Sequence, residues 1–295
     1  MIQLGKKQIK FLGISCVMMT NIAYGLLPAF SFMAVSTGVA TETLLFNKFL
    51  YGAVLVGVLI VFMKIPMKLE RHQVIPVLIT CVAYICIATS LYLAYDRISG
   101  SLATVISFTY PAMIMVLDIA TKRKKVSLAR LTSVLFSLGG LILIVVDGDL
   151  NPELGGICFA LLTAVFYVIY VYGLNSKKLE GVDSLTVTGY LLASGAVFNF
   201  FRCLLSGEPL FTAGMDQLFY MILLAVVCVF MAVLCFCLGV RWIGPGDAAI
   251  INTFEPAFAC LFSWLLIGDP MTRNMILGSL LIVVAMLIAN WKQAE

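Results

Sequence analysis

The stretch NTFEPAFACLFSWLLIGD, residues 252 to 269, has nearly the length of a membrane span but contains two residues that hydrocarbon disfavours. It is almost entirely apolar, yet Glu255 and Pro256 stand side by side near its start. An ionisable side chain is costly inside a bilayer, and proline interrupts helical hydrogen bonding. Such residues are tolerated in a span where they face a cavity or a neighbouring helix. The stretch therefore predicts a functional or packing site within a membrane.

The composition of the whole chain predicts an integral membrane protein. Of its 295 residues, 62% are hydrophobic and only 12% are charged, which is more apolar side chain than a soluble domain can bury. The nine cysteines lie in apolar runs, and we interpret them as buried free thiols. With one histidine and no metal-ligand spacing, the sequence predicts no metal and no cofactor. Its basic residues form short runs between apolar segments, so we expect no nucleic-acid partner.

Ten segments are apolar and long enough to cross a bilayer as helices, which takes about 20 residues. The first follows three lysines, but its apolar run is too long for a signal peptide, so we expect an uncleaved span. Short linkers indicate that neighbouring spans run antiparallel. The ten predicted spans are residues 11–35, 42–63, 73–95, 99–120, 127–147, 154–175, 184–205, 217–239, 245–267 and 272–291.

Lysine and arginine are distributed unevenly among the linkers, and this predicts the orientation of the chain. With the N-terminus in the cytoplasm, both ends are cytoplasmic and the inner segments hold 15 of the 19 basic residues. We therefore expect a multi-pass protein of the cell membrane, and short tails and loops favour a bacterial inner membrane. The inner residues are Lys6, Lys7, Lys10, Lys64, Lys68, Arg71, Lys122, Arg123, Lys124, Lys125, Arg130, Lys177, Lys178, Arg241 and Lys292.

The second half of the chain repeats the first. LAYDRISGSLATVISFTYPA (93–112) aligns without a gap on LGVRWIGPGDAAIINTFEPA (238–257), and the earlier spans align at a similar shift. We divide the chain into a repeat of five spans in residues 1–147 and a second in residues 148–295. Because five is odd, the second repeat must be inverted. The basic loop KRKK (122–125) against its mirror GDP (268–270) supports the inversion independently. Inverted repeats are typical of secondary transporters, which bind substrate between the repeats.

The sequence resembles the drug/metabolite transporter superfamily, specifically its EamA-type ten-helix members. FTYPAMIMVLDIATKRKKVSLARLTSVLFSLGGLILI (108–144) resembles the end of the first family repeat, and FEPAFACLFSWLLIGDPMTRNMILGSLLIVVAMLIA (254–289) the end of the second. NKF (47–49) resembles the family's Arg-Phe on span two, with Lys48 in place of arginine. The resemblance implies an all-α integral membrane fold of ten transmembrane helices, two inverted five-helix repeats around a central cavity. It also implies alternating access and a small organic substrate.

Glu255 lies about ten residues into span nine, or roughly 15 Å deep at 1.5 Å per residue, close to the bilayer centre. A cationic substrate or a proton could compete for such a carboxylate and couple transport to a gradient. The other possibility is that Glu255 only ties helices together by hydrogen bonds. Its mirror position holds Tyr110, so any charge chemistry is one-sided.

Pro256 and its mirror Pro111 both fall in mid-span. Each proline frees the carbonyl group four residues earlier, on Asn252 and on Ser107. We expect these two prolines to act as paired hinges, or to shape a cavity beside the central site.

Tyrosines and small polar residues fall on the helix faces that should surround such a cavity. Aromatic faces attract cations, and phenol hydroxyls form hydrogen bonds, so the set suits a substrate with an amino or quaternary ammonium group. Alternatively, several of the tyrosines belong to the aromatic belt at the membrane interface. The predicted substrate-binding residues are Asn21, Tyr24, Tyr84, Ser107, Tyr110, Tyr167, Tyr170, Asn252 and Glu255.

Other charged residues within the spans have simpler interpretations. Lys48 stands near the outer end of span two, where its ammonium can reach the headgroups. Asp118 stands near the basic loop KRKK, where we expect a local ion pair. KRKK itself sets the topology and contacts anionic lipid.

We predict a secondary transporter that exports a small organic metabolite, with an amino acid or related amine favoured by the resemblance. The alternatives are an importer of a quaternary amine, vitamin or nucleoside, a lipid flippase and a channel. An enzyme is not expected, because no nucleophile elbow or phosphate-cradling loop is present. Both halves are fused in one chain, so no partner is required to complete the fold, and the oligomeric state stays open.

Overall fold

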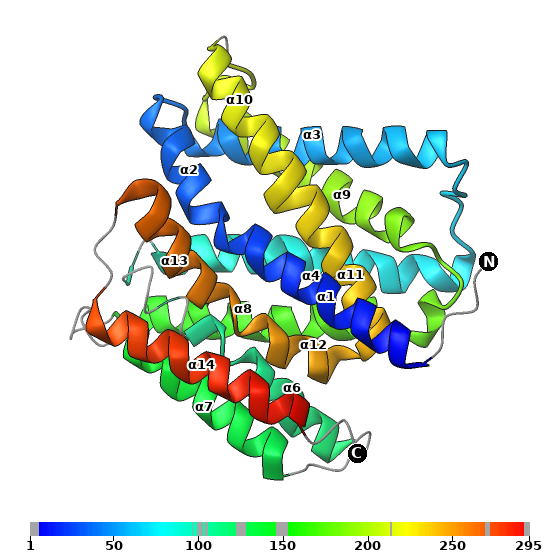
Figure 1. The fold of residues 1–295 in the computed structure, drawn as a ribbon. Coiled ribbons are helices and arrows are strands. Elements are labelled where there is room, and N and C mark those ends of the chain that lie inside the picture. Colours follow the sequence, from blue (N-terminus) through cyan, green and yellow to red (C-terminus); the bar gives the residue numbers. More distant parts are fainter. Residues whose placement is uncertain are drawn as a thin grey trace.

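A computed structural model of the protein describes residues 6–95, 97–98, 103, 106–121, 128–145, 153–212, 214–268 and 272–291. Every regular element in these residues is a helix (Figure 1). The first half contains α1 (Lys6–Gly25), α2 (Leu27–Ser36), α3 (Thr41–Phe62), α4 (Arg71–Tyr95), α6 (Tyr110–Ala120) and α7 (Leu128–Val145). The second contains α8 (Leu154–Leu174), η1 (Lys177–Leu179), α9 (Ser184–Ser206), α10 (Met215–Leu223), η2 (Leu224–Met231), α11 (Ala232–Ile243), α12 (Pro245–Asn252), α13 (Glu255–Ile267) and α14 (Arg273–Trp291).

Each of the ten predicted spans coincides with helix. Seven helical segments are long and apolar enough to cross a membrane, and several of these join consecutive helices, such as Lys7–Ser36, Met215–Ile243 and Pro245–Ile267. The described parts of the other three spans are shorter: α6, Leu131–Leu143 and Ile276–Ala285. The predicted repeat boundary between residues 147 and 148 lies outside the described residues.

The ends of α9 illustrate how the sequence sets the helix limits. The side chain of Asp183 accepts a hydrogen bond from the amide of Leu185 and so caps the first turn, at a distance of 2.7 Å. At the other end, Gly207 takes a left-handed conformation with φ of 75°, which glycine adopts without steric cost.

The described chain starts and finishes at the same end of the helix bundle. In Figure 1, α1 begins and α14 ends on the right, where the connections from α3 to α4 and from α8 to α9 also lie. This is the arrangement that an even number of spans requires. We call this the inner end, because it carries the loops predicted to be cytoplasmic, and the opposite end the outer end. That the inner end faces the cytoplasm stays a prediction.

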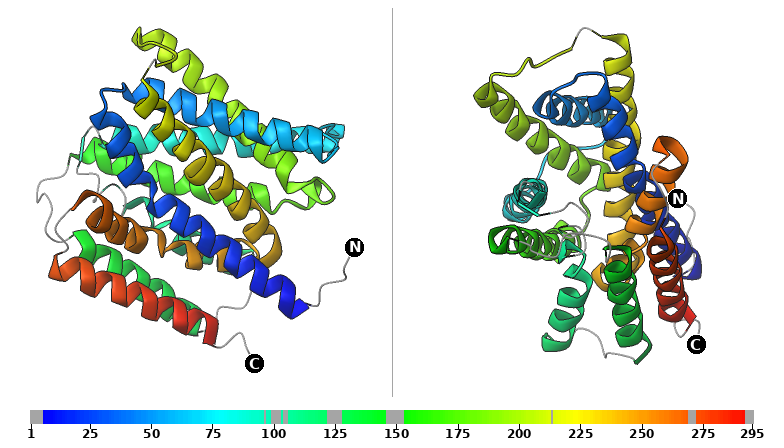
Figure 2. Two further views of the ribbon diagram at one scale, coloured as in Figure 1. Left: turned by 45° about the horizontal axis from the view of Figure 1, so that its top comes forward. Right: turned by 90° about the vertical axis from the view of Figure 1, so that its left-hand side faces the viewer.

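The helix contacts obey the two-fold exchange that inverted repeats require. The most extensive contacts join α7 to α14, α4 to α8, α3 to α9, and α1 to α11. In the repeat, α1 corresponds to α8, α3 to α9, α4 to α11 and α7 to α14. Exchanging the two halves therefore turns the α1–α11 contact into the α8–α4 contact. The α3–α9 and α7–α14 contacts each join a helix to its own counterpart, so the exchange leaves them unchanged. Figure 2 shows α7 beside α14 at one edge of the bundle and α3 near α9 towards the opposite edge. The counterparts α1 and α8 run in opposite directions in Figure 1.

Individual contacts show the same exchange. A Cβ atom at Gly13 would lie 2.5 Å from Cγ2 of Ile243, and one at Gly156 would lie 2.6 Å from Cγ2 of Ile98. Gly13 aligns with Gly156 and Ile98 with Ile243, so these are one close contact made twice. Both glycines let a helix approach the end of another helix that a side chain would hold away.

The crossing of α7 and α14 contains a second mirrored pair. The Ser133 hydroxyl donates to the carbonyl of Ala285 at 2.8 Å, and a Cβ atom at Gly140 would lie 2.6 Å from the carbonyl oxygen of Gly278. Each residue is 145 positions from its mirror, the same shift that aligns the sequence repeats. The repeat is therefore present in the packing as well as in the sequence.

Candidate functional site

Each of the two mirrored prolines stands in the first turn of a helix, directly after a short break in the helical backbone. α12 ends at Asn252 and α13 begins at Glu255, with Pro256 its second residue. Pro111 is likewise the second residue of α6. In both halves the break brings irregular backbone into the interior of the bundle, beside residues that the sequence predicted to bind substrate. Whether the prolines act as hinges stays a prediction.

Five of the nine predicted binding residues line a single cavity between the two halves. The cavity has a volume of about 20 Å³, enough for one water molecule and too small for a metabolite. The structure therefore has this central cavity in a closed form. Its lining comes from α1, α4, α8, α11 and α12 and consists of Tyr24, Tyr84, Ile87, Tyr167, Tyr170, Phe236 and Asn252.

Three of the cavity tyrosines, Tyr84, Tyr167 and Tyr170, belong to one connected aromatic cluster. The ring of Tyr84 lies 5.4 Å from that of Tyr170, and the rings of Tyr170 and Phe236 stack at 5.7 Å. Tyr110 does not line the cavity, but its ring stacks on Tyr167 at 4.6 Å with an interplanar angle of 14°. Tyr110, Tyr170 and Phe236 are buried, with at most 2% of their surface exposed, so these rings face the interior of the protein.

Glu255 does not line the cavity itself, but it is hydrogen-bonded to Asn252, which does. The amide nitrogen of Asn252 donates to the Glu255 carboxylate at 3.3 Å, a long hydrogen bond. Glu255 is half-buried, and no ion pair joins it to a described lysine or arginine. The carboxylate thus stands at the helix break, and its hydrogen bond comes from a residue of the cavity wall.

Asn21 and Ser107 lie near the helix breaks and not in the cavity lining. The side-chain amide of Asn21 donates to the backbone carbonyl of Ile251 at 2.7 Å and so joins α1 to the end of α12. Ser107 is buried three residues before α6. The Asn21 hydrogen bond therefore helps to hold the broken helix of the second half in place.

Four buried polar atoms in this region make no hydrogen bond of ordinary geometry among the described residues, although the Tyr110 hydroxyl lies near Asn252 and the Tyr170 hydroxyl near Cys237. They are Oδ1 of Asn21, Oδ1 of Asn252 and the hydroxyl groups of Tyr110 and Tyr170. Leaving a buried polar atom unpaired costs about 1–3 kcal/mol, so such atoms are rare in a finished core. Two of these residues, Tyr170 and Asn252, line the closed cavity, where a water molecule or a polar ligand can pair with their atoms.

Phe236 and Ile87 belong to the lining but were not predicted. Phe236 lies in the apolar stretch 221–240, which contains no charged, amide or hydroxyl side chain to mark it. The repeat offered a signal, because α11 is the counterpart of α4, which supplies Tyr84. An apolar residue in the wall of a binding site cannot be distinguished in sequence from one that faces lipid.

Two larger open cavities lie at the inner end. One of about 800 Å³ is bounded by the ends of α6 and α8, and one of about 460 Å³ includes Arg241. Lys177 lines both. Asp118 is buried nearby and accepts a hydrogen bond from the Tyr172 hydroxyl at 2.7 Å. Its expected partner, the KRKK loop, lies outside the described residues.

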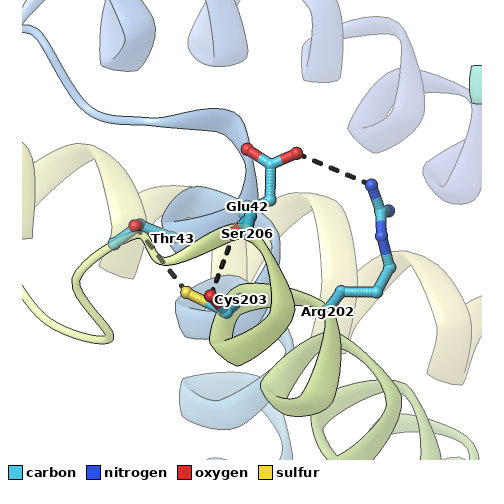
Figure 3. Close-up of polar contacts among 5 residues, drawn as sticks. All are labelled: Glu42, Thr43, Arg202, Cys203 and Ser206. Carbon is cyan, nitrogen blue, oxygen red and sulfur yellow. Dashed lines mark hydrogen bonds and ion pairs between the residues drawn. The ribbon is translucent and has the colours of Figure 1, made fainter.

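At the outer end, polar contacts join α3 to α9 and the segment that follows it (Figure 3). Arg202 pairs with Glu42 at 3.7 Å, and the Thr43 hydroxyl lies 4.0 Å from the Cys203 sulfur. The Asn47 amide also donates to the carbonyl of Leu210 at 2.7 Å. At the inner end, the Tyr190 hydroxyl of α9 donates to the carbonyl of Met67 at 2.9 Å. α9 is therefore joined to α3 at the outer end and to the linker between α3 and α4 at the inner end.

Two curated relatives are transporters by name. An "Uncharacterized transporter" of Clostridium kluyveri is 20% identical over 188 residues, covering 61% of this chain and 58% of that protein, less than two thirds of its length. The "Uncharacterized inner membrane transporter YicL" of Salmonella typhimurium is 25% identical over 232 residues, covering 75% of this chain and 74% of its own.

One crystal structure matches with a TM-score of 0.80 over 97% of this chain and 98% of its own at 14% sequence identity, which shows a shared fold. The EamA-like transporter family matches the chain twice, over residues 11–146 and 154–291, one match for each half. With ten helical spans in two repeats and a match that extends over nearly the whole sequence, the chain belongs to the EamA-like transporter family.

Proposed function

We propose that the protein is a secondary transporter that exports a small organic metabolite with an amino group, an amino acid or a related amine, by alternating access. Membership of a transporter family supports the general activity. The observation that carries the substrate class is the cavity between the halves, in which tyrosine rings and unpaired polar atoms surround the residue that bonds Glu255.

The chemistry of the cavity favours a cationic group. Tyrosine and phenylalanine rings attract cations most strongly where water is excluded, and a carboxylate without an ion-pair partner supplies the opposite charge. The unpaired tyrosine hydroxyls and asparagine carbonyls can accept hydrogen bonds from an ammonium group. A quaternary ammonium group has no N–H donor, so it would contact the rings but not these acceptors. Comparing the binding of primary amines with that of quaternary amines therefore distinguishes the proposed substrate class from a quaternary amine.

Alternating access requires the closed cavity to open. Arg202 of α9 pairs with Glu42 of α3 at the outer end, and Tyr190 of α9 is hydrogen-bonded to the linker after α3 at the inner end. We infer from these contacts that α3 and α9 move as one unit. The broken helices, α6 in one half and α12 with α13 in the other, then supply the movement around Pro111 and Pro256. The central cavity is nearest to these breaks and would change its volume most.

The experiment is a thermal-shift screen of the purified full-length protein against amino acids, primary amines, quaternary amines, nucleosides and vitamins. A ligand that binds only the folded state stabilises it by about 2.7 kcal/mol at 100 times its Kd. The screen is repeated with Glu255→Gln and with Glu208→Gln, a matched change of an exposed carboxylate in the segment after α9.

We expect an amine-bearing ligand to stabilise the wild type and Glu208→Gln but not Glu255→Gln. Flux of that ligand in proteoliposomes, measured from each side, then tests the direction of transport. Equal stabilisation of all three proteins would remove Glu255 from the site. If no amine shifts any of them, the amine proposal is wrong, and flipping of labelled lipids becomes the next assay.

A further inference from the structure

Lys48 is buried in the protein and does not reach the membrane surface as the sequence suggested. It stands in the second turn of α3 with 8% of its surface exposed, between the buried residues Asn47 and Phe49. α3 packs against α9 on one side and against η2 on another. The side chain therefore ends within the protein, where a lysine is rarely found without a partner.

No acidic group neutralises Lys48 among the described residues. Its ammonium lies 5.4 Å from the centre of the Phe49 ring, and the nearby titratable group on η2 is the thiol of Cys228. Glu42, on the same helix, pairs with Arg202 instead. A buried charge without a partner costs several kcal/mol, so this position is unfavourable for folding alone.

The neighbouring helix is also irregular at this position. η2 is a π-helix over residues Leu224–Met231, whereas its counterpart α4 is α-helical throughout. π-helical segments are uncommon and often occur at functional sites. Lys48 and η2 are thus two unusual features from opposite halves that contact one another.

Phe49 connects Lys48 with the central cavity. The Phe49 ring meets Tyr84 edge to face at 6.0 Å, and both line a small cavity of about 20 Å³ between α3, α4 and α9. Tyr84 also lines the central cavity. Arg202 also lines the cavity between α3, α4 and α9, so two cations, Arg202 and Lys48, stand on the outer side of Tyr84.

We propose that the Lys48 ammonium forms an anion subsite at the contact of α3 with η2, and that this subsite takes a carboxylate group of the transported molecule. A lysine has a flexible four-carbon stem, so its ammonium can pass around one aromatic ring to meet a ligand. The assignment rests on the proposed function and adds to it a carboxylate group on the substrate.

The test measures the melting temperature of the full-length protein with sodium acetate, with sodium chloride and with sodium gluconate, a bulkier anion, at constant ionic strength. The variants are Lys48→Met, which has similar volume and no charge, Lys48→Arg, which retains the charge, and Glu255→Gln. We expect acetate to raise the melting temperature of the wild type and Lys48→Arg by at least about 2 °C relative to gluconate, and to leave Lys48→Met unchanged.

The variants also distinguish the possible causes. Without added acetate or chloride, Lys48→Met should melt at a higher temperature than the wild type, because an unpaired buried charge is removed. A lower melting temperature would show a structural role and overturn the subsite. Chloride acting as strongly as acetate would assign the subsite to inorganic anions and overturn the carboxylate assignment, and no shift with either anion would remove the subsite. Glu255→Gln should retain the acetate response, so the subsite can stand even if the amine screen fails.

Discussion

The two halves of the molecule share their packing and differ in their charges. At the periphery, mirrored residues make mirrored contacts, as Gly13 with Ile243 and Gly156 with Ile98 show. Within the bundle the halves diverge, because Glu255 of the second half corresponds to Tyr110 of the first. The symmetric contacts build the fold, and under the proposed function the asymmetric residues adapt it to one substrate.

The largest effect should come from the asymmetric position. Glu255→Gln removes a charge-assisted interaction worth about 2 kcal/mol, so binding of an amine ligand should weaken about 30-fold. Tyr110→Phe, at the mirror position, removes only one neutral hydroxyl and should weaken binding less than about 10-fold. Titration calorimetry of both variants measures the difference. Equal losses would mean that the two halves contribute equally and that the carboxylate has no special role.

The crossing of α7 and α14 should be the most sensitive of the symmetric contacts. Gly140→Val places a branched side chain against the backbone carbonyl of Gly278, which cannot move aside, and should destabilise the protein by about 2–3 kcal/mol. Gly139→Val is the matched control, because a Cβ atom there meets only the end of the Leu281 side chain at 3.4 Å. Melting temperatures of the two variants should differ by several degrees. If they coincide, the close crossing is absent.

The mirrored glycines should respond equally. Gly13→Ala and Gly156→Ala each place a Cβ atom against the Cγ2 atom of an isoleucine, and the expected loss of stability is about 1 kcal/mol. The reference is Gly57→Ala, where no atom lies within 4 Å. Removing the contacting Cγ2 atom, by Ile243→Ala for Gly13→Ala and by Ile98→Ala for Gly156→Ala, should make each double variant lose less stability than the sum of its two single variants. A clear inequality between the two glycines would show that the packing symmetry is only approximate.

The smallest effect should come from the ion pair at the outer end. Arg202 and Glu42 are partly exposed and 3.7 Å apart, so Arg202→Gln should change stability by less than about 1 kcal/mol. Raising the salt concentration should reduce even this difference. A larger loss, insensitive to salt, would mean that the pair holds the α3–α9 unit together.

Much of the fold follows from the sequence, because the number, length and antiparallel order of the spans depend on composition and on linker length. The internal repeat also predicted which helices are counterparts. The cavity-lining tyrosines were found because their spacing follows helix periodicity, and helices facing a common centre bring them together. Tyr24, Tyr84, Tyr167 and Tyr170 illustrate this.

Side-chain direction around the helix axis was harder to predict. The sequence predicted Lys48 at the membrane surface because its position along the span can be counted from the sequence. The direction of its side chain around the helix axis, towards η2, cannot be derived in this way. Phe236 gave no signal, since apolar residues occupy both the lipid face and the cavity wall. The π-helix also has no sequence signature, as it depends on how α10 and α11 pack against α3 and α1.

The most direct test of a binding site between the halves is photo-crosslinking with a diazirine derivative of the stabilising ligand, followed by mass spectrometry of the labelled peptides. We expect labels on the segments of α1, α4, α8, α11 and α12 that line the central cavity, in both halves at once, and competition by the unmodified ligand. Labels confined to one half, or to the open cavities at the inner end beside Lys177, would contradict the site.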